Sequence, residues 1–117
     1  MHIEDLYFNY EPSNVENGAW APALVFGKSL NVSSDGIMKE IIRHNYPARQ
    51  FFYPLSLLPA YNQEKQGRIN NPISYDIYNR GIQLPCALNL TANQISKYSK
   101  IISNYIKKES NKKNIYH

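Results

Sequence analysis

The chain has 117 residues, which is the length of one compact domain and too short for most two-domain enzymes. Ten Tyr, four Phe and one Trp, with only 19% charged residues, argue against a disordered chain. The net charge of +4 belongs to the C-terminal end, because six of the 13 basic residues lie between Lys97 and Lys113.

The N-terminal segment is polar and mixed in composition. We expect residues 1–18 to form a lead-in segment or linker, in which the apolar spacing over residues 2–10 allows a short helix. The apolar run 19–26 (AWAPALVF) predicts the first strand. Because Pro22 has no N–H group, this strand is expected at a sheet edge or at a bulge.

A helix is predicted next, with Ser33 or Ser34 as its cap and with its end near His44, before Pro47. Its apolar stripe comprises Ile37, Met38, Ile41 and Ile42. Residues 48–53 (ARQFFY) then predict the second strand.

Residues 62–71 are polar and are predicted to form a mobile loop. A second helix follows, with Asn71 as its N-cap, Pro72 in its first turn and Gly81 in the left-handed conformation after its end. The residues expected on its apolar face are Ile73 and Ile77. Residues 82–84 predict a short third strand.

The last predicted helix starts at Thr91 and runs to about Lys108 or beyond. Its apolar positions recur at helical spacing: Ile95, Tyr98, Ile101, Ile102, Tyr105 and Ile106. The order of elements predicts an α/β domain of the α+β type, a small layered fold with helices on a sheet of about three short strands. The domain would span residues 19–110, followed by a polar basic tail over residues 111–117.

Most common catalytic sites have no counterpart in this sequence. One cysteine, Cys86, gives no disulfide framework, and the three histidines share no metal-ligand spacing. The five glycines are isolated, so no phosphate-binding loop is present, and no lysine is placed for Schiff-base chemistry. We therefore expect no catalytic residue, metal or cofactor in this chain alone.

Nucleic-acid and membrane roles are not expected either. The basic C-terminal segment contains no arginine, the residue that base-edge contacts favour. No run approaches the ~20 apolar residues of a membrane-spanning helix, and no signal peptide is recognisable. A cytoplasmic location is the expectation that follows.

Arg49 stands out because it lies in an otherwise apolar predicted strand. A buried guanidinium needs an anionic partner, since desolvating an unpaired charge is costly. That partner is either a carboxylate of this or a neighbouring chain, or the carboxylate or phosphate of a ligand.

Five segments, in order, resemble the C-terminal domain of the DegT/DnrJ/EryC1/StrS aminotransferases. They are residues 18–26 (GAWAPALVF), the predicted helix over 34–44, residues 49–55 with 59–61 (RQFFYPL and PAY), residues 81–85 (GIQLP), and Leu90-Thr91 followed by Ile95. Together they cover about residues 15–107.

The resemblance implies the small C-terminal domain of a fold-type-I, PLP-dependent enzyme that aminates keto sugars attached to nucleotides. The family's catalytic lysine, ring-binding aspartate and phosphate-binding loop lie in a larger N-terminal domain and have no match here. By resemblance, Arg49 lies near the active-site mouth. The candidate substrate-binding residues are Arg49, Tyr53 and Ser56. Many members carry a histidine where this chain has Ser56.

Two hypotheses follow from the resemblance. In the first, the chain is a sugar aminotransferase domain of cell-surface polysaccharide or deoxyamino-sugar biosynthesis, inert alone, which needs a PLP-binding large-domain chain or a homo-oligomer. In the second, it is a non-catalytic module that binds sugar nucleotides or another protein. A truncated gene, a split subunit and a cloned fragment all remain open.

Both hypotheses predict an exposed apolar patch where the larger domain would meet this one. The candidates for this patch are Phe51, Phe52, Tyr53, Leu57 and Leu58.

Overall fold

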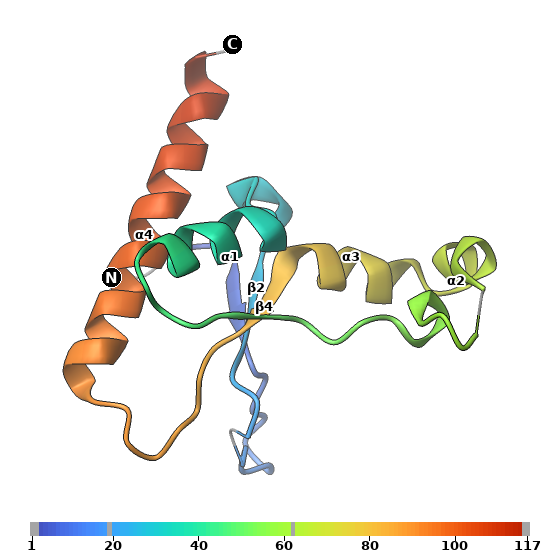
Figure 1. Cartoon of the computed structure of the whole chain (residues 1–117), viewed down its shortest axis with the longest axis horizontal. Coiled ribbons are helices and arrows are strands. Elements are labelled where there is room, and N and C mark those ends of the chain that lie inside the picture. The colour runs from blue at the N-terminus through green and yellow to red at the C-terminus, as the bar shows by residue number, and fades with distance from the viewer. Residues whose placement is uncertain (1–2, 19, 62, 116–117) are drawn as a thin grey trace.

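The computed structural model describes residues 3–18, 20–61 and 63–115, with side chains as far as residue 112. Within these residues, four short strands form one antiparallel sheet in the order β1-β2-β4-β3. The strands are β1 (Leu6–Phe8), β2 (Ala23–Phe26), β3 (Arg49–Gln50) and β4 (Gly81–Gln83). The helices are α1 (Ser34–Arg43), α2 (Glu64–Asn70), α3 (Pro72–Arg80) and α4 (Ala92–Ile115). The predicted small layered α+β fold is confirmed (Figure 1).

β1 shows that the helix predicted over residues 2–10 is wrong, although His2 itself lies outside the described residues. Leu6 pairs with Phe26 and Phe8 pairs with Leu24, so this segment forms an edge strand. Pairing with a distant strand overrode the weak local periodicity. The boundary expected at residue 18 stays a prediction.

β2 is shorter than the predicted strand and lies in the interior of the sheet. It pairs with β1 on one side and with β4 on the other, so the expected edge position is wrong. Pro22 precedes the strand, and its missing N–H therefore removes no bond from the ladder. Its carbonyl accepts a hydrogen bond from the Leu84 N–H at 2.9 Å.

α1 begins and ends as predicted. The Ser33 hydroxyl accepts a hydrogen bond from the Gly36 N–H at 3.1 Å, and Asn45 adopts a left-handed conformation (φ 61°) just after the helix. The apolar stripe is narrower than expected. Ile37 and Ile41 are fully buried, whereas 54% of Ile42 is exposed.

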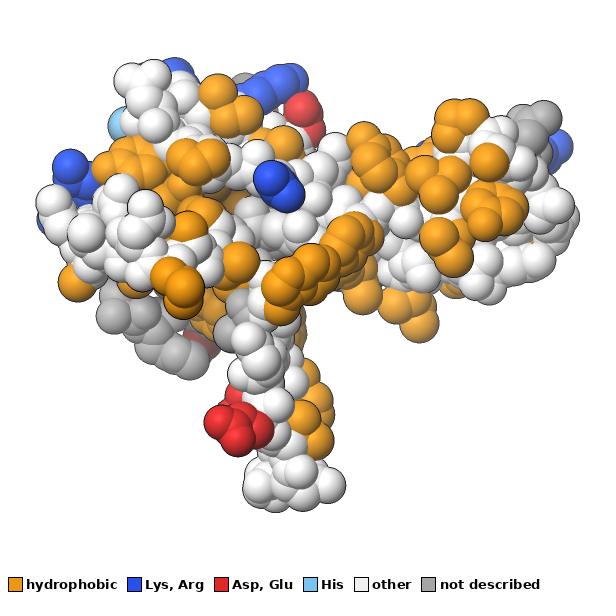
Figure 2. All heavy atoms as spheres, turned by 60° about the horizontal axis from the view of Figure 1, so that its bottom comes forward, with side chains coloured by type: hydrophobic (Ala, Val, Ile, Leu, Met, Phe, Trp, Pro, Cys, Tyr) orange, Lys and Arg blue, Asp and Glu red, His pale blue; other side chains and the backbone are white. Residues whose placement is uncertain are grey.

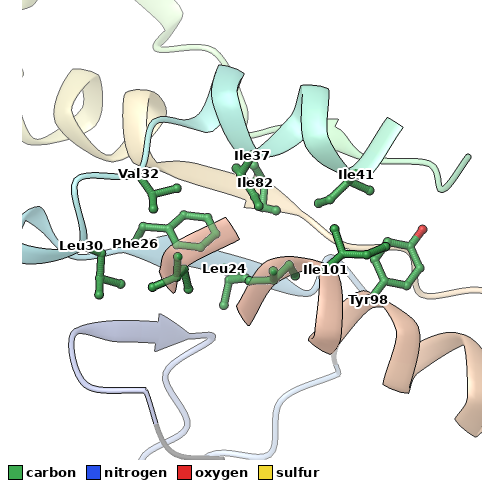
Figure 3. Close-up of a cluster of buried hydrophobic side chains, with 11 residues drawn as sticks. Leu24, Phe26, Leu30, Val32, Ile37, Ile41, Ile82, Tyr98 and Ile101 are labelled. Atoms are coloured by element: carbon green, nitrogen blue, oxygen red, sulfur yellow. The ribbon is translucent and has the colours of Figure 1, made fainter. Parts of the chain in front are cut away.

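The core lies between α1, the middle strands and α4 (Figure 3). Leu24 and Phe26 of β2 and Ile82 of β4 are each no more than 1% exposed. α4 contributes four buried side chains: Tyr98, Ile101, Ile102 and Ile106. Its predicted stripe is confirmed at these positions but not at Ile95, which is 54% exposed.

The start of α4 carries a reciprocal cap. The Thr91 hydroxyl accepts a hydrogen bond from the Gln94 N–H at 3.2 Å, and the Gln94 side chain accepts one from the Thr91 N–H at 2.9 Å. The helix runs to Ile115, in agreement with a predicted end at Lys108 or beyond. Its last turns project away from the sheet (Figure 1).

The loop predicted over residues 62–71 is wrong, because residues 64–70 form helix α2. Asn62 lies outside the described residues. The Glu64 carboxylate binds Arg68 at 2.7 Å, and the Gln66 amide donates to Asn70 at 2.8 Å. Pairs at this spacing stabilise a helix that lacks a strong apolar stripe.

α3 starts at Pro72 as predicted, but Asn71 makes no side-chain capping bond. Tyr75 is the buried residue of the helix, and Ile73 is 73% exposed, so the predicted apolar face is wrong at Ile73. Gly81 is extended (φ −111°) and begins β4. A Cβ there would lie 2.8 Å from the Phe51 ring, so close packing, rather than a left-handed turn, favours glycine.

Candidate functional site

The candidate site residues, Arg49, Tyr53 and Ser56, lie in β3 and in the segment that leads from β3 into a projecting arm. We define the arm as residues 51–61 and 63–80, which include the 3-10 helix η2 (Leu55–Leu57), α2 and α3. The arm extends away from the sheet, and its tip carries α2 (Figure 1). α2 contacts both η2 and α3, so the tip folds as one unit.

Arg49 lies in β3 at the edge of the sheet, where it is paired in register with Gln83. The apolar neighbours of Arg49 in the sequence suggested that its side chain is buried, and this is wrong: β3 has only two residues and the Arg49 side chain is exposed. No ion pair of Arg49 occurs among the described residues. An exposed guanidinium of this kind is available to an incoming carboxylate or phosphate.

Tyr53 lies at the base of the arm and is 54% exposed. Its ring centroid is 5.2 Å from that of Tyr78 in α3, with an angle of 36° between the rings. Burial, followed by the neighbouring Tyr53 hydroxyl, raises the pKa of Tyr78. The pair presents a neutral, partly open aromatic surface.

Ser56 lies in η2, and its hydroxyl contacts another side chain of the arm. Its hydroxyl is 2.9 Å from the hydroxyl of the buried Tyr75. α2 approaches closely, since a Cβ added to Gly67 would lie 2.0 Å from the Ser56 Oγ atom. Ser56 therefore joins η2, α2 and α3 at the tip of the arm.

A shallow pocket of about 380 Å³ also reaches Ser56. Its other lining residues are Pro54, Leu55, Tyr61, Gln63, Asn71 and Ser74. The lining is uncharged, with hydroxyl and amide groups beside one aromatic ring. Of the three predicted site residues, Ser56 alone lines this pocket, which therefore does not bring the three together.

A charged cluster that was not predicted from the sequence joins the end of α3 to the end of β2. Arg80 donates to both Asp76 oxygens, at 3.1 and 2.6 Å, and also to the Phe26 carbonyl. Lys28 lies 3.9 Å from the same carboxylate, and hydrogen bonding to Arg80 lowers the pKa of Asp76. The i,i+4 spacing of Asp76 and Arg80 is the sequence signal for this pair. Because Arg80 and Asp76 neutralise each other, this pair has a structural role.

The predicted apolar patch is confirmed in part. Phe52 and Tyr53 are 61% and 54% exposed, whereas Phe51, Leu57 and Leu58 are half-buried. Further exposed apolar side chains of the arm are Leu55, Tyr61, Ile69 and Ile73. Figure 2 shows apolar side chains gathered over the arm. Such a surface is typical of a protein contact.

The described residues contain no cluster of three or more His, Cys, Asp or Glu side chains that could hold a metal ion. None of the helices in the described part of the chain is long and apolar enough to cross a membrane.

Replacing Ser56 with alanine should weaken the arm rather than the whole fold. The buried Tyr75 hydroxyl would keep only its 3.5 Å contact with the Glu64 carbonyl, at an expected cost of about 1 kcal/mol. Hydrogen exchange of α2 amides is the measurement, and faster exchange is expected. Ser74→Ala, at an exposed position in the same pocket, is the control and should leave exchange unchanged. Equal exchange in both variants would contradict the assigned role of Ser56.

Comparison with known proteins gives a family match and a curated relative. The model described as the DegT/DnrJ/EryC1/StrS aminotransferase family matches residues 3–103, which include all four strands. The chain is also 27% identical to the GDP-perosamine synthase of Vibrio cholerae over 95 residues. The aligned residues cover 81% of this chain and 26% of the Vibrio cholerae protein, so the chain spans about a quarter of the length of that relative.

Proposed function

Because this chain belongs to the DegT/DnrJ/EryC1/StrS aminotransferase family, we propose that it acts as the small C-terminal domain of a nucleotide-sugar aminotransferase. The observation that carries the proposal is the family match, which extends over the whole sheet. The named relative makes a GDP-linked amino sugar, which favours nucleotide-sugar substrates and a role in polysaccharide or deoxyamino-sugar biosynthesis. A cytoplasmic location remains part of the proposal.

The residues of this chain do not fit PLP, the cofactor of the family. A lysine that bonds to PLP needs a buried site and a lowered pKa. Every lysine whose side chain is described is exposed, and a hydrogen bond to Asp35 raises the pKa of Lys39. The lysine and the phosphate-binding loop would therefore come from a PLP-binding large domain, and this chain would be inert without it.

The arm would be the part of this chain that meets the large domain or a second copy of the chain. Its exposed apolar side chains support this role, because a solitary domain gains nothing by exposing them. Arg49 would bind an anionic group of the nucleotide sugar, and Tyr53 would offer an aromatic surface beside it. Ser56 would act mainly by holding the tip of the arm in place.

Calorimetric titration with GDP-perosamine tests the role of Arg49. The Arg49→Ala variant should bind at least about tenfold more weakly than the wild type, since it loses a charge-assisted hydrogen bond. Arg43→Ala is the matched control, because Arg43 is exposed and already paired with Glu40. Equal affinities of the wild type and Arg49→Ala would contradict the proposed contact. If the wild type binds GDP-perosamine, Arg49→Ala does not, and no PLP-bearing partner is recovered with the chain, the results would favour the non-catalytic binding module.

A further inference from the structure

An apolar groove of about 610 Å³ lies between the sheet and α4, apart from the arm. Leu6 and Phe8 of β1 form one wall, and Ile95, Tyr98 and Ile102 of α4 form the other. None of the described residues that line the groove is charged. Phe8 is 68% exposed and Ile95 is 54% exposed, so the groove presents large apolar side chains to solvent. A concave apolar surface of this kind is typical of a binding site for another chain.

Lysines mark the outer flank of this groove. Ser103 lines the groove, and Lys100 and Lys107 lie three residues before it and four residues after it on α4. This spacing places all three residues on one face of the helix. Both lysines are exposed, and neither takes part in an ion pair among the described residues. A chain that fills the groove would therefore gain from carboxylates along this flank.

We propose that the groove seats an amphipathic helix with acidic residues along one flank, supplied by the PLP-binding polypeptide. The identity of that polypeptide rests on the proposed function, whereas the chemistry of the groove does not. A helix is favoured over an added strand, because β1 has only three residues and offers few backbone groups at its edge. An apolar helix face can instead place side chains at i, i+3, i+4 and i+7 between β1 and α4.

Fluorescence anisotropy with designed peptides tests the proposal on the full chain. The probe is a helical peptide of about 18 residues with leucines at i, i+3, i+4 and i+7 and with glutamates beside them. A second peptide carries lysines in place of the glutamates. The glutamate peptide should bind at least about tenfold more tightly than the lysine peptide. Reversing both flank charges in Lys100→Glu/Lys107→Glu should remove this preference. Lys97→Glu/Lys108→Glu is the matched control, because it makes the same charge change on another face of α4.

The apolar wall is tested by Ile95→Asp, which should weaken binding of the glutamate peptide at least about tenfold. Ile42→Asp is the matched control, because Ile42 is also 54% exposed and lies in α1, outside both the groove and the arm; it should leave peptide binding unchanged. Equal binding of the two peptides, or none, would overturn the proposal. So would a dimer of the wild-type chain that becomes monomeric in Ile95→Asp, because a second copy would then fill the groove.

The source of the helix is tested by capture of a PLP-bearing polypeptide from source cells with the wild-type chain and with Ile95→Asp. Loss of capture in the variant alone is expected. Equal capture by both proteins would overturn the groove assignment while leaving the proposed function intact. Failure of the proposed function is a different result, in which the wild-type chain itself captures no PLP-bearing polypeptide.

Discussion

Replacing Phe26 with alanine should lower the free energy of unfolding by about 3–5 kcal/mol. Phe26 is fully buried in β2, among the side chains where α1 and α4 meet the sheet. Removing its ring leaves a cavity that surrounding helices and strands can only partly close. Since a small domain is stable by only about 5–15 kcal/mol, this one change should bring the chain close to unfolding.

Urea unfolding followed by circular dichroism measures this effect. Phe52→Ala is the matched control, because Phe52 is 61% exposed and its loss should cost less than about 1 kcal/mol. If Phe26→Ala proves too unstable to purify, Phe26→Leu gives a smaller loss that can still be measured. Losses of equal size for Phe26→Ala and Phe52→Ala would show that the described core is wrong.

The second large effect concerns catalysis. The pure chain, supplied with PLP, an amino-acid donor and a GDP-linked keto sugar, should show no turnover and no lysine-bound PLP chromophore. The reason is that its described lysines are all exposed, and none offers the buried environment that the reaction needs. Addition of the PLP-binding polypeptide should raise the rate by at least about 10⁶-fold, the lower end of enzymatic rate enhancements.

The GDP-perosamine synthase of Vibrio cholerae, assayed under the same conditions, is the positive control. The measurement is the amount of GDP-linked amino sugar formed. Turnover by the pure 117-residue chain would contradict its assignment as a domain that is inert alone.

The elements that could be predicted from the sequence are those fixed by local signals. Ser33 caps α1 and the Thr91–Gln94 pair caps α4, and each signal lies within four residues of the helix that it starts. The strand at β4 was also predictable, because Ile82 and Leu84 alternate with the polar Gln83 between Gly81 and Pro85. Such signals depend on bonds between near neighbours, which composition and spacing reveal.

The elements that were missed depend on partners far away in the chain. β1 is held to the body of the protein by Asp5, whose carboxylate accepts hydrogen bonds from Tyr7 and from the Ser29 N–H. Hydrogen bonding to Ser29 is the main cause that lowers the pKa of Asp5. No pattern within residues 2–10 predicts the contact between Asp5 and Ser29. The interior position of β2 likewise follows from strand order, which a single sequence does not reveal.

The same division applies to the candidate site. The segment that carries Arg49, Tyr53 and Ser56 could be recognised from its residues. Its environment could not, because the exposure of Arg49 follows from the edge position of β3 and the contact of Ser56 depends on Tyr75, which lies 19 residues further along the chain in α3. The buried arginine that the apolar sequence suggested is therefore replaced by an exposed cation at a sheet edge.

The role that we propose for this chain, as the small domain of an aminotransferase, requires that the PLP site lie on another domain. The most direct measurement is a native pull-down of the chain from its source cells, followed by an absorbance scan for PLP and an assay of amino-sugar formation. We expect a larger, PLP-bearing polypeptide in the eluate, together with amino-sugar formation. Recovery of the chain alone, without the PLP chromophore, would contradict the proposed role.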